Sequence, residues 1–197
     1  MSTICYETTK REKLNFLFTA KHPYNLANLF TFVNIASGIL AMYFIVHNDF
    51  TTAIILAWIA GAFDIFDGKI ARKYNLSTEF GIQIDSFADF ISFVLVPTFL
   101  IHQAIFSTGD TSLILVAIVQ IYYVISALRR LINFNIDADA GGVEKYFTGV
   151  PTPLGAILQW FVFLMWQYEI VQNGYISLIL IATIGYLLNS KIKIRHP

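Results

Sequence analysis

Residues 51–72 read TTAIILAWIAGAFDIFDGKIAR, a long apolar run whose second half carries two aspartates. A helix of about 20 apolar residues is long enough to cross the hydrocarbon core of a bilayer. Backbone polar groups find no water in that core, and the run does not alternate apolar with polar residues as a barrel strand does. The stretch therefore predicts a transmembrane α-helix with acidic groups near one end.

Similar runs recur along the 197-residue chain, which is 56% hydrophobic and 13% charged and has a mean hydropathy of +0.63. An average soluble domain carries about 25% charged residues. We expect one domain over residues 1–197, an all-α integral membrane protein with six transmembrane helices. The predicted spans lie near residues 28–47, 51–72, 82–106, 111–133, 151–169 and 174–190.

The basic residues predict how the chain is oriented in the membrane. Six spans put both termini on one side, and all thirteen Lys and Arg fall on that side. The positive-inside rule makes this side cytoplasmic. We expect a multi-pass protein of the plasma membrane, with both termini and the active site on the cytoplasmic side. Thirteen Asp and Glu balance the charge, so the chain has no net basic field to attract nucleic acid.

Two segments outside the spans carry further expectations. Residues 10–22 mix Lys and Arg with Leu and Phe, which favours an amphipathic helix lying in the cytoplasmic interface over a disordered basic tail. The longest connection between spans is expected at residues 134–150, also on the cytoplasmic side. Paired glycines in it are typical of a mobile loop, although most such loops are simple connections.

Four carboxylates lie at the cytoplasmic ends of two consecutive spans: Asp64 and Asp67 in the second, Asp85 and Asp89 in the third. Spacings of three and four residues put each pair on one helix face. A short connection makes the two helices antiparallel neighbours, so the pairs can face one another. Carboxylates this close repel unless a cation lies between them. Oxygen ligands favour one or two hard divalent cations such as Mg²⁺, Mn²⁺ or Ca²⁺.

Carboxylates inside a membrane protein also build cation pathways, so a divalent-cation transporter is the alternative from a different class. The neighbouring residues favour an enzyme. Gly68, Ala71 and Gly81 let a bulky ligand approach the helix backbone, and Arg72 has a charge suited to phosphate. Carboxylates for metal, small residues for access and arginine for phosphate predict metal-assisted phosphoryl transfer.

Residues 64–89, DIFDGKIARKYNLSTEFGIQIDSFAD, resemble the signature of the CDP-alcohol phosphotransferase family at every fixed position and gap. The resemblance implies a six-helix membrane fold, a homodimer, and transfer of a substituted phosphate from a CDP-linked donor to an alcohol with release of CMP. It also implies that the four aspartates bind two divalent cations, Mg²⁺ or Mn²⁺, and that Asp89 is the base. Residues expected at the donor are Asn28, Thr31, Asp64, Gly68, Ala71, Arg72, Gly81 and Asp85.

Within this family, residues 28–193 are similar to the phosphatidylserine synthase group. The similarity rests on NLFTFVN at 28–34, on DSFAD at 85–89, on RLINFN at 130–135 and on FTGVPTP at 147–153. It implies a phosphatidyl or archaetidyl donor in the membrane lipid and L-serine as the acceptor. The alternative acceptors are glycerol phosphate, inositol phosphate or another small alcohol.

A serine pocket needs a cation for the carboxylate and oxygen atoms for the ammonium group. Arg130 ends a helix on the cytoplasmic side and can hold a carboxylate through two charge-assisted hydrogen bonds; the alternative is that it only anchors the helix end. Asn133, Asn135, Thr148 and Ser86 are the candidate neutral contacts.

Overall fold

The computed structural model describes residues 15–19, 22–107, 111–139, 146–190 and 193–195. A continuous helical rod is built from α4 (Glu79–Asp89), the π-helical turn η2 (Phe90–Leu95), α5 (Val96–Ile101) and a second π-helical turn, η3 (His102–Phe106). The other long helices are α2 (Leu26–Val46), α3 (Phe50–Tyr74), α6 (Leu113–Asp139), α7 (Thr152–Gln167) and α8 (Gly174–Leu188). Shorter elements are the 3₁₀ turn η1 (Asn15–Phe18) and the strands β1 (Tyr146–Thr148) and β2 (Lys193–Arg195).

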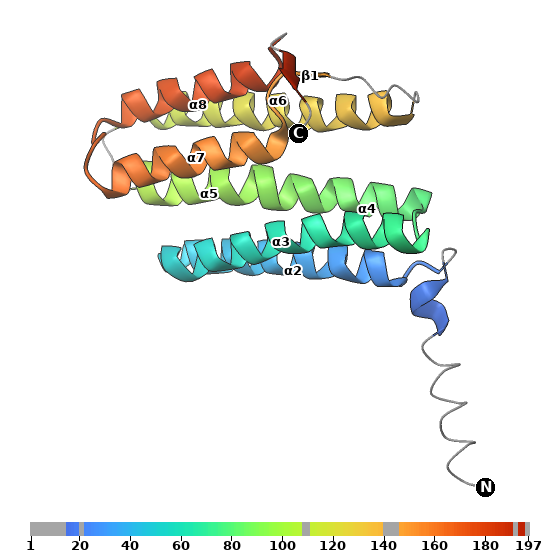
Figure 1. The fold of residues 1–197 in the computed structure, drawn as a ribbon. Helices are drawn as coiled ribbons and strands as arrows, with labels where there is room; N and C mark the ends of the chain where they lie inside the picture. The colour runs from blue at the N-terminus through green and yellow to red at the C-terminus, as the bar shows by residue number, and fades with distance from the viewer. Residues whose placement is uncertain (1–14, 20–21, 108–110, 140–145, 191–192, 196–197) are drawn as a thin grey trace, which may run out of the picture.

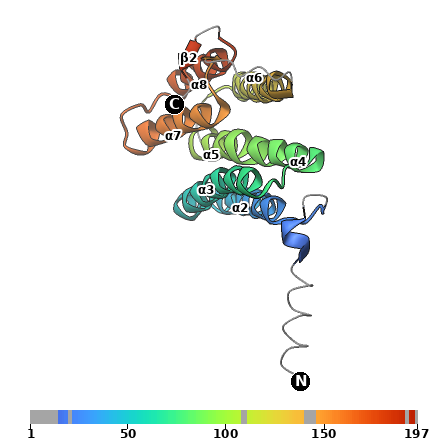
Figure 2. The same ribbon diagram turned by 45° about the vertical axis from the view of Figure 1, so that its right-hand side comes forward.

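The long helices run side by side in layers (Figure 1). The pair α2 and α3 forms one side of the bundle, the α4–η3 rod lies in the middle, and α7 packs between that rod and α8. Helix α6 packs against α8 on the other side of the bundle, as the turned view in Figure 2 also shows. The turn from α3 into α4 lies at the same end of the bundle as η1.

Among the residues that the structure describes, four helices are long and apolar enough to cross a membrane: α2, α3, the α4–η3 rod, and α6 over Leu113–Ile136. The apolar helix α8 is shorter, with 15 residues. The prediction of a helical, multi-pass membrane protein is thus confirmed, whereas the count of six spans stays a prediction.

The connection expected at residues 134–150 differs from its prediction. Helix α6 continues to Asp139 instead of ending near residue 133, because no glycine or proline interrupts it before Gly141. Strand β1 then pairs antiparallel with β2, with Phe147 opposite Ile194. The sequence predicts an all-α chain, and this short ribbon is an addition to it.

The predicted N-terminal amphipathic helix falls mainly on residues outside the described ranges. Of its span, the structure describes the single 3₁₀ turn of η1 and a few flanking residues. Phe18 of this turn contacts Tyr74 at the end of α3, with ring centroids 5.4 Å apart.

Side-chain caps fix where the helices around the α3–α4 turn begin. The side chain of Asn25 accepts a hydrogen bond from the backbone of Asn28 at the start of α2, and Thr78 does the same for Gly81 in α4. Such caps satisfy backbone N–H groups that the helix itself leaves unpaired. Asn25 also donates to the carbonyl of Leu76, 3.1 Å away. One buried asparagine thereby ties the start of α2 to the α3–α4 turn.

At the opposite end of α3, Asp49 is the capping residue. Its carboxylate accepts hydrogen bonds from the hydroxyl and the backbone of Thr52, at 2.7 and 3.1 Å. These bonds, the hydroxyl first, lower the pKa of Asp49. The ionised carboxylate also suits the positive end of the helix dipole.

The helical rod changes its winding just after Asp89. The π-helical turn η2 starts at Phe90 and precedes Pro97, which lies in the first turn of α5. Proline has no N–H to complete the regular helical bond, and single π-helical turns accommodate such interruptions and are frequent at functional sites. The wider turn sets the rotation of Ser92 relative to α2.

We expect Gly149→Ala to lower the apparent melting temperature of the purified protein in detergent. Gly149 has a φ of +87°, and a Cβ there would lie 2.5 Å from the backbone oxygen of Leu188. The left-handed conformation alone costs an alanine about 1–2 kcal/mol. For a chain of this size, each kcal/mol lowers the melting temperature by roughly 2–4 °C. Gly61→Ala is the control, because its Cβ would make an ordinary 3.5 Å contact with Phe93. Equal melting temperatures for the two variants would contradict the prediction.

Candidate functional site

Three predicted carboxylates meet where α3 faces α4. Oxygen atoms of Asp64, Asp67 and Asp85 all lie within 4.8 Å of one another. Asp67 is the most enclosed, with 4% of its side chain exposed. Helix α3 contributes the first two from one face, and α4 runs back along it to contribute the third. The arrangement offers only oxygen donors, which suits a hard divalent cation.

Asp89 adjoins this group one turn further along α4. Its carboxyl group lies within hydrogen-bond reach of that of Asp64. Its Oδ1 atom is buried and has no hydrogen-bond partner among the residues that the structure describes. A buried carboxylate oxygen without a donor is costly, so this atom fits a bound cation or a proton. We call Asp64, Asp67, Asp85 and Asp89 the carboxylate cluster.

Helix α2 supplies hydrogen-bond donors to the carboxylate cluster. The hydroxyl of Thr31 donates to Asp67 Oδ2 at 2.8 Å, and the amide of Asn34 donates to Asp64 Oδ1 at 3.4 Å. The hydroxyl of Ser92, in η2, donates to Asn34 Oδ1 at 2.6 Å. The carboxylates of α3 therefore accept hydrogen bonds from polar side chains of α2, and Asn34 is bonded in turn to η2.

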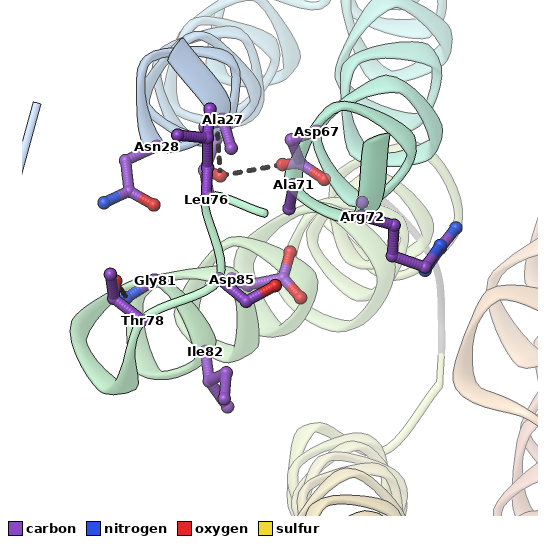
Figure 3. Close-up of a pocket in the computed structure, with 13 residues that line it drawn as sticks. Ala27, Asn28, Asp67, Ala71, Arg72, Leu76, Thr78, Gly81, Ile82 and Asp85 are labelled. Atoms are coloured by element: carbon purple, nitrogen blue, oxygen red, sulfur yellow. Dashed lines mark hydrogen bonds between the residues drawn. The ribbon is translucent and has the colours of Figure 1, made fainter. Parts of the chain in front are cut away.

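A polar cavity of about 210 Å³ opens beside the cluster (Figure 3). Every residue predicted at the donor lines it except Asp64, so the structure brings together side chains from α2, α3 and α4. In the view of Figure 3, Gly81 and Arg72 lie at opposite sides of the cavity, with Asp67 and Asp85 between them. The guanidinium of Arg72 lies over Gly68, where a Cβ would be 3.5 Å from Nη1.

Close helix approach shapes the wall of this polar cavity. A Cβ on Gly81 would lie 2.8 Å from Asn28 Oδ1, so only glycine lets α4 begin this close to α2. Asn28 is itself fixed, since its amide nitrogen donates to the carbonyl of Pro23 at 2.9 Å. A rigid amide oxygen is thereby presented at the cavity wall.

A second, apolar cavity of about 330 Å³ lies beside Asp64, between α3, η2 and α7. Trp58, Phe93 and Trp160 are among its lining residues. Asp64 is the one member of the carboxylate cluster among the residues lining this cavity. The cluster therefore adjoins one polar and one apolar cavity.

The residues predicted at the acceptor are brought together only in part. Asn135 of α6 donates to the hydroxyl of Ser86 in α4 at 2.7 Å, which joins α6 to the helix that carries Asp85. Arg130 is buried, and its Nε donates to the carbonyl of Val150 at 3.3 Å. Asn133 is exposed on α6, and the side chain of Thr148 lies outside the described set.

Sequence reasoning did not assign site roles to Asn34 and Ser92, although Asn34 ends the stretch at 28–34 that carries part of the family resemblance. For Asn34 the spacing in the sequence was a usable signal. Thr31 and Asn34 are three residues apart in one span, as Asp64 and Asp67 are in the next. It also missed cavity-lining residues near the α3–α4 turn: Ala27, Leu76, Ser77, Thr78 and Ile82.

Comparison with known proteins agrees with the motif in this site. The protein named CDP-diacylglycerol–serine O-phosphatidyltransferase in Bacillus subtilis is 31% identical over 170 residues, which are 85% of this chain and 88% of that protein. The protein of the same name in Methanocaldococcus jannaschii is 30% identical over 90% of this chain and 77% of its own length. The archaetidylserine synthase of Methanothermobacter thermautotrophicus is 29% identical over 82% of this chain and 69% of its own length.

The family model described as CDP-alcohol phosphatidyltransferase matches residues 24–187, from the start of α2 to the last turn of α8. This match contains the whole carboxylate cluster and both cavities beside it, and it confirms the resemblance stated from the motif alone. The chain belongs to the CDP-alcohol phosphatidyltransferase family.

Proposed function

We propose that this protein transfers the phosphatidyl or archaetidyl group of a CDP-linked lipid to the hydroxyl of L-serine, releasing CMP. The observation that carries the proposal is the carboxylate cluster beside the polar cavity, in a chain of this family. The names of the similar proteins support serine as the acceptor, and they include both a phosphatidyl and an archaetidyl product. Family membership favours this transferase over a divalent-cation transporter.

The two cavities fit a donor that is polar at one end and apolar at the other. The polar cavity, with Arg72 and the amide oxygen of Asn28, suits the charged CDP group. The apolar cavity, with Trp58 and Trp160, suits lipid chains, which need only apolar surface. The bond to be broken would then lie near Asp64, which adjoins the apolar cavity and belongs to the carboxylate cluster.

Asp64, Asp67, Asp85 and Asp89 would hold two divalent cations, Mg²⁺ or Mn²⁺. The residues fit such ions because their donors are all carboxylate oxygens and because Asp89 Oδ1 is buried without a hydrogen-bond donor among the described residues. When bound, divalent cations supply charge that stabilises the entering and leaving oxygens of an in-line phosphoryl transfer.

We assign Asp89 as the base. It accepts the proton of the serine hydroxyl, whose oxygen forms a bond to the lipid-linked phosphorus while the bond from that phosphorus to the CMP oxygen breaks. A base needs hydrogen-bond reach to the hydroxyl, and Asp89 lies one turn further along α4 than Asp85, with a free Oδ1 among the described contacts. Arg72 compensates negative charge on the departing CMP.

Serine would approach from the side of α6. The hydrogen-bonded pair of Ser86 and Asn135 adjoins Asp85, the neighbour of Ser86 in α4, and offers neutral polar groups. Arg130 supplies the cation for the serine carboxylate, with Asn133 and Thr148 as further contacts of the acceptor.

The predicted topology completes the proposal. Six spans place both termini and the carboxylate cluster at the cytoplasmic face of the plasma membrane, with the segment around η1 lying in the interface. The exposed rings of Phe16 and Phe18 suit that position. One domain over residues 1–197 and association into a homodimer are part of the same proposal.

Metal removal is the first test. We expect chelation to abolish CMP release by purified protein and Mn²⁺ or Mg²⁺ to restore it, because the proposed reaction needs divalent cations bound to the carboxylate cluster. Asp64→Asn and Asp85→Asn should abolish turnover while the protein stays folded. Asp49→Asn is the matched control, since asparagine also caps helices well and Asp49 caps the opposite end of α3. CMP release in thoroughly metal-free protein would refute the metal assignment.

A second test separates chemistry from donor binding. Asp89→Asn should lower kcat by about 10²–10⁴, the usual effect of losing a general base, with little change in the KM for the CDP-linked lipid. Metal content has to be measured on the same samples, since Asp89 is also assigned as a ligand. Near-normal turnover in a fully metal-loaded variant would mean that another group is the base.

The acceptor is tested with a panel. One CDP-linked lipid is offered with serine, glycerol phosphate, inositol phosphate or glycerol, and the lipid product is identified by mass. We expect serine to give the highest kcat/KM by at least a factor of about 10⁴, because a site built for a polar group rejects partners that leave it unpaired. Preference for another alcohol would keep the family chemistry and overturn the choice of serine.

A further inference from the structure

A buried chain of hydrogen bonds leads from η2 to the carboxylate cluster. Ser92 bonds to Asn34 Oδ1 at 2.6 Å, and Asn34 Nδ2 bonds to Asp64 Oδ1 at 3.4 Å. The chain is enclosed, since Asn34 is 0% and Ser92 4% exposed. Buried polar groups in an apolar bundle are costly unless they are hydrogen-bonded. Two such residues in one chain of hydrogen bonds therefore call for an explanation.

The chemistry of the three groups fixes the direction of the chain. An ionised carboxylate can only accept hydrogen bonds, so the NH₂ end of the Asn34 amide must face Asp64. The amide oxygen then faces Ser92, whose hydroxyl has to be the donor. Without that hydroxyl, the Asp64 carboxylate alone would hold the amide, and the buried amide oxygen of Asn34 would lose its hydrogen-bond donor.

The bundle makes room for this contact at Gly38, one helical turn after Asn34. A Cβ at Gly38 would lie 3.0 Å from Ser92 Oγ and 2.9 Å from a methyl group of Ile91. The absence of a side chain there allows η2 to lie directly on α2. The π-helical turn and the glycine together bring the Ser92 hydroxyl to the Asn34 amide.

We propose that Asn34 and Ser92 are positioning residues for the carboxylate cluster. Ser92 holds the Asn34 amide in one orientation, and Asn34 holds the Asp64 carboxylate in the position in which it binds a divalent cation. The proposal rests on the proposed role of Asp64 as a metal ligand. Groups that orient a metal ligand from behind typically change metal affinity by about 10–100-fold when they are removed.

The alternative is that Asn34 and Ser92 only join α2 to η2. Both roles predict some loss of thermal stability, so stability does not separate them. A positioning role predicts weaker metal binding in the absence of any substrate, together with recovery of turnover at high metal concentration. A purely structural role predicts neither.

The test measures Mn²⁺ binding to purified protein in lipid nanodiscs without donor or acceptor, from the loss of the electron paramagnetic resonance signal of free Mn²⁺. We expect Asn34→Ala and Ser92→Ala each to raise the Kd for Mn²⁺, by about 10–100-fold for the first. Saturating Mn²⁺ should restore most of the kcat of Ser92→Ala. Thr98→Val is the control, because its hydroxyl bonds only to the carbonyl of Val94, 2.7 Å away, in the described contacts.

The double variant decides whether Ser92 acts through Asn34. If it does, Ser92→Ala adds nothing to the Kd of a protein that already carries Asn34→Ala, because the amide to be oriented is gone. Effects that simply multiply would overturn the proposed chain. Wild-type Mn²⁺ affinity in Ser92→Ala would also overturn it, since this substitution removes one hydroxyl and is small enough to leave the fold intact. An equal loss of Mn²⁺ affinity in Thr98→Val would overturn it too.

Asp64→Asn keeps failure of this inference distinct from failure of the proposed function. If Asp64→Asn loses Mn²⁺ while Asn34→Ala and Ser92→Ala bind it normally, Asp64 is a ligand and the positioning role is wrong. If Asp64→Asn binds Mn²⁺ as the wild type does, the metal assignment and the positioning role both fall.

Discussion

Repulsion among four carboxylates at the ends of two apolar helices is the constraint on which the rest of this structure depends. Asp64, Asp67 and Asp85 have oxygens within 4.8 Å of one another, and Asp89 adjoins them. Ionised groups this close and this enclosed are stable only with opposite charge and hydrogen-bond donors around them. The polar face at the start of α2, the tight α3–α4 turn and the polar cavity beside them all serve that need.

The helix packing follows from bringing donors to those carboxylates. Thr31 and Asn34 lie three residues apart on α2 and meet Asp67 and Asp64, three residues apart on the antiparallel α3. Each donor must reach across a helix interface, so the interfaces are close, and at Gly81 and Gly38 any side chain would collide with a neighbour. Packing in this bundle is therefore specified by polar contacts as much as by apolar burial, as is common where helices associate inside a membrane.

The sequence was most informative where local periodicity decides the outcome. Helical spacing predicted correctly that Asp64 and Asp67 share a face and meet Asp85, and apolar runs located the helices to within a few residues at most ends. It could not predict the contact of Ser92 with Asn34, which depends on a π-helical turn and on the rotation of one helix against another. The β1–β2 ribbon was also missed, because it pairs residues that lie on either side of two helices. Helix α6 was placed too short because its last turns are polar, and an apolar run shows where a membrane span ends, not where a helix does.

The two cavities beside the carboxylate cluster also indicate where acceptor specificity must originate. In the proposed function, the carboxylate cluster and Arg72 would recognise divalent cations and the phosphates of any CDP-linked donor, and the apolar cavity would recognise only that the donor has lipid chains. Neither can distinguish serine from another alcohol, since discrimination between small polar molecules requires groups that are left unpaired by the wrong one. We propose such groups on the α6 side, where Asn135 bonds to Ser86 and Arg130 donates to the backbone of Val150. Members of this family with the same cluster and a different α6 can therefore share one transfer reaction and differ in the alcohol that they accept.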